Sequence, residues 1–231
     1  MNENNKNEEF KVEVDKEELK SQTKETVNQV KETVKNINFK EDAKATKGFV
    51  LEFIKNPATT IKSVTDEKQN YFSSAIMLMI CYIVASGLGG LVNLIKYSGN
   101  EYSSYGIFDF LLTVINPVLF ILAITIAIIL LGGKDKKSMT TILSGVIIAN
   151  APRIISELLS VINIIFIKVK VVLWCSSILQ SAIGFISVAL TFLAIKGLIK
   201  TEDDDKFIRK VTIIMVVAYA ILKVLSICGL Y

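Results

Sequence analysis

Histidine is absent from this chain of 231 residues, and cysteine, proline and tryptophan are scarce. Without histidine, neither histidine acid–base catalysis nor histidine metal ligation is available. The three cysteines, Cys81, Cys175 and Cys228, lie far apart within apolar segments, so we expect small buried residues and no disulfide framework or zinc site. The sequence also has no phosphate-binding glycine loop and no nucleophile motif. It therefore predicts a protein that is not an enzyme and that carries no metal or other cofactor.

Charge is unevenly distributed along the chain. Residues 1–70 hold 13 Lys and 14 acidic residues, whereas the much longer segment 71–231 holds 13 basic and 8 acidic residues. Apolar residues make up 52% of the chain, and the mean hydropathy is +0.49. This excludes an ordinary soluble domain and predicts a polytopic membrane protein. Most basic residues of segment 71–231 lie between its apolar stretches, so they indicate the topology of the chain in the membrane. Nucleic acid is therefore not an expected partner.

Five apolar segments are each long enough to cross about 30 Å of hydrocarbon, which takes roughly 20 residues. The expected spans are 71–95, 107–131, 140–166, 171–195 and 211–230. Two of them contain a proline, Pro117 and Pro152, and we expect each to kink its helix. The predicted fold class is all-α, with a domain of five transmembrane helices over 71–231 after an amphipathic and partly disordered cytoplasmic region.

Basic residues near the span ends predict the orientation. If the N-terminus is cytoplasmic, the inner segments hold 11 basic residues and the outer ones 3. Residues 1–47 have no apolar stretch of the kind that a signal peptide needs. We therefore expect a multi-pass protein of the cell (plasma) membrane with its N-terminus inside and its C-terminus outside. The excess of Lys over Arg, 24 to 2, is typical of an AT-rich bacterial genome.

Residues 1–47 are predicted to form a polar cytoplasmic tail that is partly helical. Its first ten residues are rich in Asn and Glu and are expected to be disordered. Further on, apolar residues recur at spacings of 3, 4 and 3 and predict a narrow helical stripe: Val27, Val30, Val34 and Ile37. A coiled-coil strand, a helix lying on the membrane and a loose cytosolic helix all fit this pattern.

Residues 48–70 are predicted to form an interfacial amphipathic helix and a linker. This segment contains a short cluster of apolar residues, which is too short to span a bilayer and suits a helix that lies under the lipid headgroups. Its expected anchors are Phe49, Leu51, Phe53, Ile54 and Pro57. Asn56 and Pro57 predict the end of one helix and the start of the next.

Three charged residues fall inside predicted spans, where each costs about 2.5–3.5 kcal/mol. At about 1.5 Å per residue, Arg153 and Lys223 lie about 20 Å from the inner surface and Glu157 about 25 Å. Arg153 and Glu157 are four residues apart on one helical face, so they can pair. We therefore predict a buried polar cluster in which Glu157 is the anion between Arg153 and Lys223.

Three uncharged polar residues, Asn116, Asn150 and Gln180, fall at similar depth and complete this candidate layer. The layer can join the helices, or its lysine can extend to the membrane surface, and both are structural roles. An ion or substrate pathway and a proton-sensing site are the functional alternatives.

Small residues four positions apart allow helices to approach closely, within the bundle or between copies in a homo-oligomer. Such pairs are Ser86 and Gly90, Ala85 and Gly89, and Ser177 and Ser181. The acidic run from Glu202 to Asp205 has lysine neighbours and no ligand-spaced loop, and it is expected to be a solvated cytoplasmic loop.

The pattern resembles the Yip-domain family, the Ypt/Rab-interacting five-span membrane proteins, over roughly residues 48–231. A Phe-rich turn is followed by Pro and a Thr/Ile segment, and a Gly-Gly-Lys loop leads into a third span with an internal Pro. The matching residues are Phe53, Pro57 and Ile61, and Gly132, Gly133, Lys134 and Pro152. The Asp-Leu-Tyr-Gly-Pro motif of eukaryotic relatives and the zinc ribbon of many bacterial ones are absent, so the resemblance is to a bacterial-type member without the zinc ribbon.

The resemblance implies an integral membrane scaffold or adaptor that acts on membrane organisation or partner binding. The expected partners are the lipid bilayer, a protein bound through the N-terminal tail, and further copies of the chain. The alternative is a small transporter or channel that uses the mid-membrane polar layer.

Overall fold

The computed structural model describes residues 16–66, 71–97, 105–132, 137–199 and 204–227, and in these ranges the protein is helical without any strand, which confirms the all-α class. The helices are α1 (Lys16–Lys35), α2 (Phe39–Lys55), α3 (Pro57–Thr65), α4 (Phe72–Tyr97), α5 (Ile107–Leu131), α6 (Met139–Asn150), α7 (Arg153–Ile165), α8 (Lys170–Leu198) and α9 (Asp204–Ile227). Several predictions lie outside the described residues: those for the first ten residues, Gly133, Lys134, Glu202, Asp203 and Cys228.

Three helices, α4, α5 and α8, are long and apolar enough to cross a membrane. A fourth crossing is available if α6 and α7, bent by 41° at the break between them, count as one span. The chain is therefore a membrane protein with three to four candidate spans in its described part. The fifth predicted span, 211–230, overlaps α9 and ends outside the described residues, so this span stays a prediction.

The bundle core is centred on α6, which packs against both α5 and α8. Its centre is made of aliphatic side chains that are fully buried, among them Ile128, Ile142 and Ile195. On α4, the Ser86 hydroxyl donates to the carbonyl of Thr113 over 2.8 Å, and a Cβ at Gly90 would lie 3.0 Å from Phe110. This pair of small residues therefore brings α4 close to α5.

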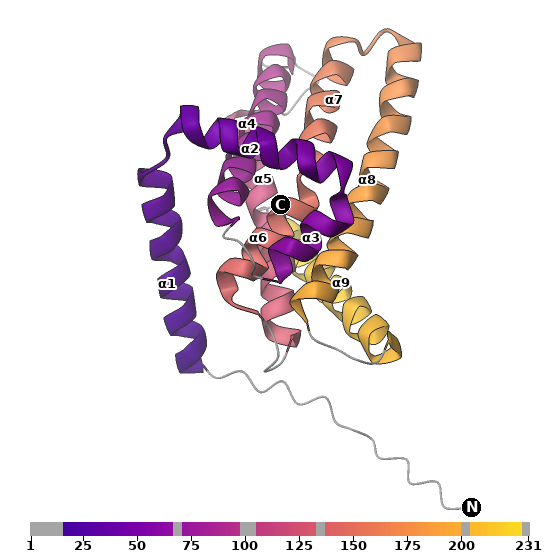
Figure 1. Cartoon of the computed structure of the whole chain (residues 1–231). Helices are drawn as coiled ribbons and strands as arrows, with labels where there is room; N and C mark the ends of the chain where they lie inside the picture. The colour runs from indigo at the N-terminus through magenta and orange to yellow at the C-terminus, as the bar shows by residue number, and fades with distance from the viewer. Residues whose placement is uncertain (1–15, 67–70, 98–104, 133–136, 200–203, 228–231) are drawn as a thin grey trace, which may run out of the picture.

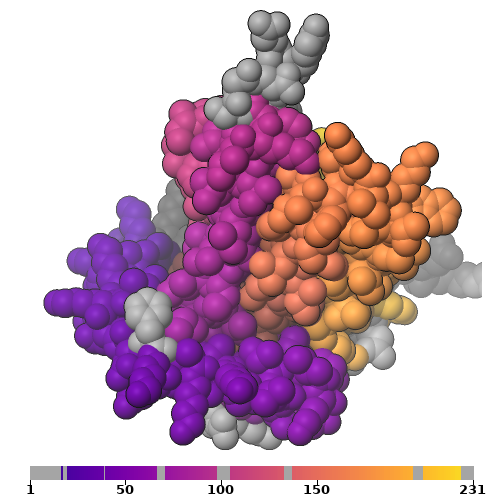
Figure 2. Space-filling view, turned by 90° about the horizontal axis from the view of Figure 1, so that it is seen from above, coloured from indigo at the N-terminus to yellow at the C-terminus, as the bar shows by residue number. Residues whose placement is uncertain are grey.

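The N-terminal helices lie along one side of the bundle. Figure 1 shows α1 and α2 nearly at right angles to each other, with α1 at the outer side of the bundle, where it contacts α4 and α6. Figure 2 shows the same helices, in indigo and purple, along one edge of the molecule. As predicted at Asn56 and Pro57, α2 ends at Lys55 and α3 begins at Pro57, although the Asn56 amide donates to the Glu52 carboxylate over 2.7 Å and does not cap α3.

The predicted interfacial anchors point in two directions. Phe53 is buried in the core cluster, and the ring of Phe49 packs against Tyr71 with 5.2 Å between ring centroids. Leu51 and Ile54 are exposed on the other side of α2. Pro57, at the start of α3, is also exposed. Half of the apolar cluster thus holds α2 on the bundle, and half remains available to a membrane surface.

Helix α3 is buried more deeply than a linker would be. Ile61 and Thr65 are 1% and 0% exposed, and the helix packs between α6 and α8. At Gly197 of α8, a Cβ would lie 2.1 Å from the Thr65 hydroxyl oxygen, so only glycine allows this approach. The sequence did not predict this contact, because Thr60 and Thr65 interrupt the short apolar pattern of 57–65.

Candidate functional site

The break between α6 and α7 follows from the proline predicted to kink this span. Pro152 has no backbone N–H to donate to the carbonyl of Ile148, which instead accepts from the N–H of Ala151 over 3.1 Å. The next N–H groups also bond three residues back, from Ile154 to Ala151 over 3.1 Å and from Ile155 to Pro152 over 3.0 Å. The chain turns by 41° here. In contrast, α5 continues through Pro117 as one helix.

Arg153 is the first residue of α7, and its guanidinium lies 4.1 Å from the centre of the Phe120 ring on α5. This is a cation–π contact at short range, which offsets part of the cost of placing the charge among apolar side chains. The Arg153 Nε is buried without a hydrogen-bond partner. Glu157 lies one turn further along α7 and is half-buried, and the structure, which describes both residues, shows no salt bridge between them.

Asn150, at the end of α6, is 1% exposed and joins α6 to α8. Its side-chain amide donates to the Thr191 hydroxyl over 3.3 Å and to the carbonyl of Val146 over 2.9 Å. Thr191 in turn donates to the carbonyl of Ser187 over 2.7 Å. This part of the predicted layer therefore forms a buried link between helices.

Gln180 makes a second link, between α8 and α7, which Figure 1 shows side by side as a hairpin. Its amide donates to the Ser160 hydroxyl over 2.9 Å and to the carbonyl of Ser156 over 3.2 Å. One turn earlier on α8, the Ser176 hydroxyl donates to the side-chain oxygen of Asn163 on α7. These bonds hold together two helices that otherwise bury little of their surface.

Asn116 and Lys223 lie on outward faces. The Asn116 side chain is exposed on α5, and the Lys223 ammonium on α9 lies 5.9 Å from the centre of the exposed Tyr219 ring. No hydrogen bond or ion pair among the described side chains joins Lys223 to Arg153 or Glu157. Three members of the predicted layer thus contact residues outside it, Arg153 with Phe120, Asn150 with Thr191 and Gln180 with Ser160, and Lys223 does not lie beside Glu157 as predicted.

A second polar region, which the sequence did not single out, lies at the end of the bundle where α8 finishes. Three lysines and one aspartate line a hollow there: Lys62, Lys137, Lys196 and Asp66. The N–H of Lys137 also donates to the carbonyl of Leu198 over 3.3 Å, which ties the start of α6 to the end of α8. The lysines come from three distant segments, so no local motif in the sequence marks the site.

Metal-ligating side chains do not gather in the part of the chain that the structure describes. The expectation that the cysteines are buried is wrong for Cys81 and Cys175, which are free thiols exposed on the outer faces of α4 and α8. Comparisons with family models, curated proteins and solved structures found no match to this chain.

Proposed function

We propose that this protein is an integral membrane scaffold or adaptor, without enzymatic activity, that presents α1 to a partner protein. The observation that carries the proposal is the exposure of two apolar side chains on α1. Val27 and Val34 are 45% and 49% exposed and lie on one stripe of α1, whereas Thr26, on the face that meets the bundle, is 5% exposed. An exposed apolar stripe suits docking against a partner's helix.

Helix α1, the N-terminal arm, is joined to two helices that are fixed on the bundle, and this supports the same role. Helix α2 is held on the bundle by Phe53, and α3 is held by the contact between Thr65 and Gly197. Leu51 and Ile54 project from α2 and suit insertion under the headgroups. The arm is therefore attached to a rigid, membrane-bound platform.

The proposed topology is five spans in the cell membrane, with the N-terminal arm cytoplasmic and the C-terminus outside. The ratio of 11 basic residues inside to 3 outside supports this orientation. The resemblance of residues 48–231 to the Yip-domain family supports the scaffold role, and a homo-oligomer is compatible with it.

The test is capture of partners from membranes that contain the full-length protein. A Val27→Asp and Val34→Asp double variant places two carboxylates on the stripe, and the partner should be lost. The matched control is a Ser21→Asp and Asn28→Asp double variant, which adds the same charges seven residues apart at exposed positions of another face. Equal capture by both variants would contradict the adaptor role of the stripe.

A small transporter or channel is the second candidate, because the α6–α7 span is broken at Pro152, next to Arg153. Discontinuous helices mark ion and substrate sites in many transporters, and the Arg153 Nε is buried without a partner. If this candidate is correct, liposomes that contain the protein should leak protons, K⁺ or Cl⁻, and Arg153→Gln should abolish the leak. Liposomes as tight as protein-free ones would rule out conduction of these ions.

A further inference from the structure

The lysine-lined hollow has more basic than acidic side chains in its lining, which suits an anion. It has a volume of about 490 Å³ and lies between α3, the start of α6 and the last turns of α8. Three lysines face one carboxylate, so the lining carries a net positive charge. Lys62 projects from α3 and Lys196 from α8, and the contact of Thr65 with Gly197 fixes these two helices against each other. The two ammonium groups are therefore carried by a rigid frame.

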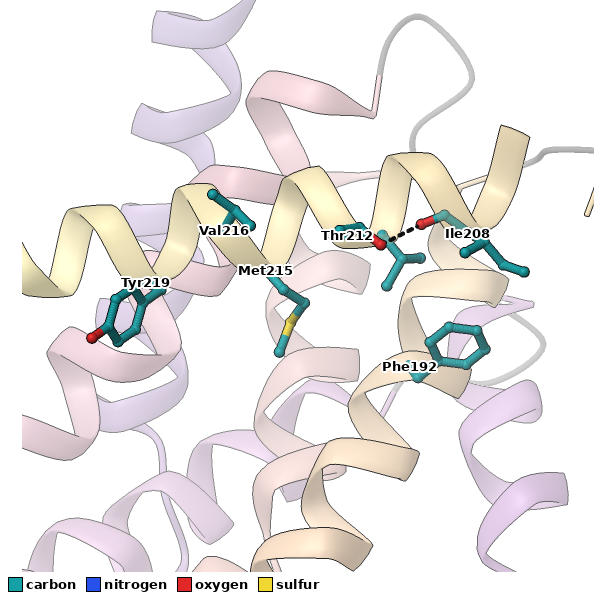
Figure 3. Close-up of a pocket in the computed structure, with 7 residues that line it drawn as sticks. Phe192, Ile208, Thr212, Met215, Val216 and Tyr219 are labelled. Atoms are coloured by element: carbon teal, nitrogen blue, oxygen red, sulfur yellow. Dashed lines mark hydrogen bonds between the residues drawn. The ribbon is translucent and has the colours of Figure 1, made fainter. Parts of the chain in front are cut away.

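An apolar groove lies next to this hollow, between α8 and α9. Its volume is about 450 Å³, and Phe192, Met215 and Tyr219 are among its lining residues. Figure 3 shows the side chains of Met215 and Phe192 in the space between the two helices. The lining is mostly apolar, and the Thr212 hydroxyl donates to the carbonyl of Ile208 within α9 over 2.9 Å, so the groove suits a hydrocarbon chain.

The lining residues of α9, from Ile208 to Tyr219, extend over about 16 Å along the helix axis. This is about half of the roughly 30 Å of bilayer hydrocarbon, so the groove is comparable in length to one acyl chain.

Aromatic rings join the hollow to the groove. The Lys196 ammonium lies 5.6 Å from the centre of the Phe207 ring, and this ring meets Phe192 edge-on with 5.0 Å between centroids. Phe207 is itself 3% exposed and lines neither region. Lys196 lines the hollow, and Phe192, one turn earlier on α8, lines the groove, so the cationic hollow and the apolar groove are neighbours on the surface of α8.

We propose that this surface binds an anionic phospholipid, with the headgroup phosphate in the hollow and an acyl chain along the groove. The lysines supply the charge complement of the phosphate, and the groove distinguishes a lipid from free phosphate. A zwitterionic lipid adds a cation that the same lysines repel. The site goes beyond the scaffold role and does not depend on it.

The experiment is native mass spectrometry of the full-length protein in detergent, with lipid titrated in. Four ligands are compared: long-chain phosphatidylglycerol, long-chain phosphatidylcholine, short-chain phosphatidylglycerol and sodium phosphate. Long-chain phosphatidylglycerol should bind most tightly. Lys62→Gln and Lys196→Gln should each raise its Kd about fivefold. Both lysines are exposed, so these variants should keep the fold.

The matched controls are Lys168→Gln and Lys170→Gln, which remove the same charge at the opposite end of α8. They should leave the Kd unchanged. Equal binding of the two long-chain lipids would overturn the proposal, as would control variants that lose as much affinity as Lys62→Gln. Full competition by sodium phosphate would assign the hollow to a free phosphate and overturn the lipid site.

Discussion

Replacing Gly197 with alanine puts a methyl group where α3 already lies. The new Cβ would be 2.1 Å from the Thr65 hydroxyl oxygen and 2.6 Å from the Thr65 Cβ. Thr65 is completely buried and its hydroxyl donates to the carbonyl of Lys62, so it cannot move aside without displacing α3.

The magnitude follows from two opposing terms. Overpacking a well-packed contact typically costs about 1–3 kcal/mol. Replacing glycine with alanine in a helix contributes about 0.5–1 kcal/mol in the other direction. We therefore expect Gly197→Ala to lower the free energy of unfolding by about 1–2 kcal/mol. Gly184→Ala, on the same helix but with nothing within 4 Å of its Cβ position, should instead be neutral or stabilising.

The assay is equilibrium unfolding in mixed micelles of a mild detergent and dodecyl sulfate, followed by circular dichroism. A double variant, Thr65→Gly with Gly197→Ala, moves the small residue to the other helix and should recover part of the loss. If Gly197→Ala were as stable as Gly184→Ala, the close contact of α3 with α8 would be refuted.

Three further predictions concern the bundle. Asn150→Ala should lower stability by about 0.6–1.7 kcal/mol in the same unfolding assay, because it removes the link to α8, whereas Ser181→Ala should have almost no effect since this exposed hydroxyl bonds only within its own helix. Ile214→Ala should cost about 2–5 kcal/mol because the side chain is fully buried on α9, whereas the exposed Val216→Ala should stay within about 0.5 kcal/mol. Trp174, the single tryptophan, is 76% exposed on an apolar face of α8, so brominated lipids should quench its fluorescence, and no quenching would place this face away from lipid.

The spans could be predicted because their signal is the length of an apolar run, which needs no knowledge of packing. Helices α4, α5 and α8 lie within three residues of the predicted 71–95, 107–131 and 171–195. The break at Pro152 was also predictable, since a missing N–H acts within one turn of the chain.

Contacts between helices were not predictable from the sequence. The rise per residue of a helix gives the depth of a residue in the membrane, but it does not say which neighbouring helix the side chain faces. Asn150 and Asn116 were placed at similar depth, yet one is buried against α8 and the other is exposed. Lys62 and Lys196 share a hollow only because α3 packs on α8, and 133 residues of sequence separate them.

The number of crossings decides whether the two ends of the chain lie on the same side of the membrane. In a chain with its native cysteines replaced by serine, Ser21→Cys and Tyr231→Cys can be tested separately with a membrane-impermeant maleimide on intact cells. Five spans with a cytoplasmic arm predict that the cysteine at 231 is labelled and the one at 21 is protected until the cells are opened. Protection or labelling of both would mean an even number of crossings and would contradict the proposed topology.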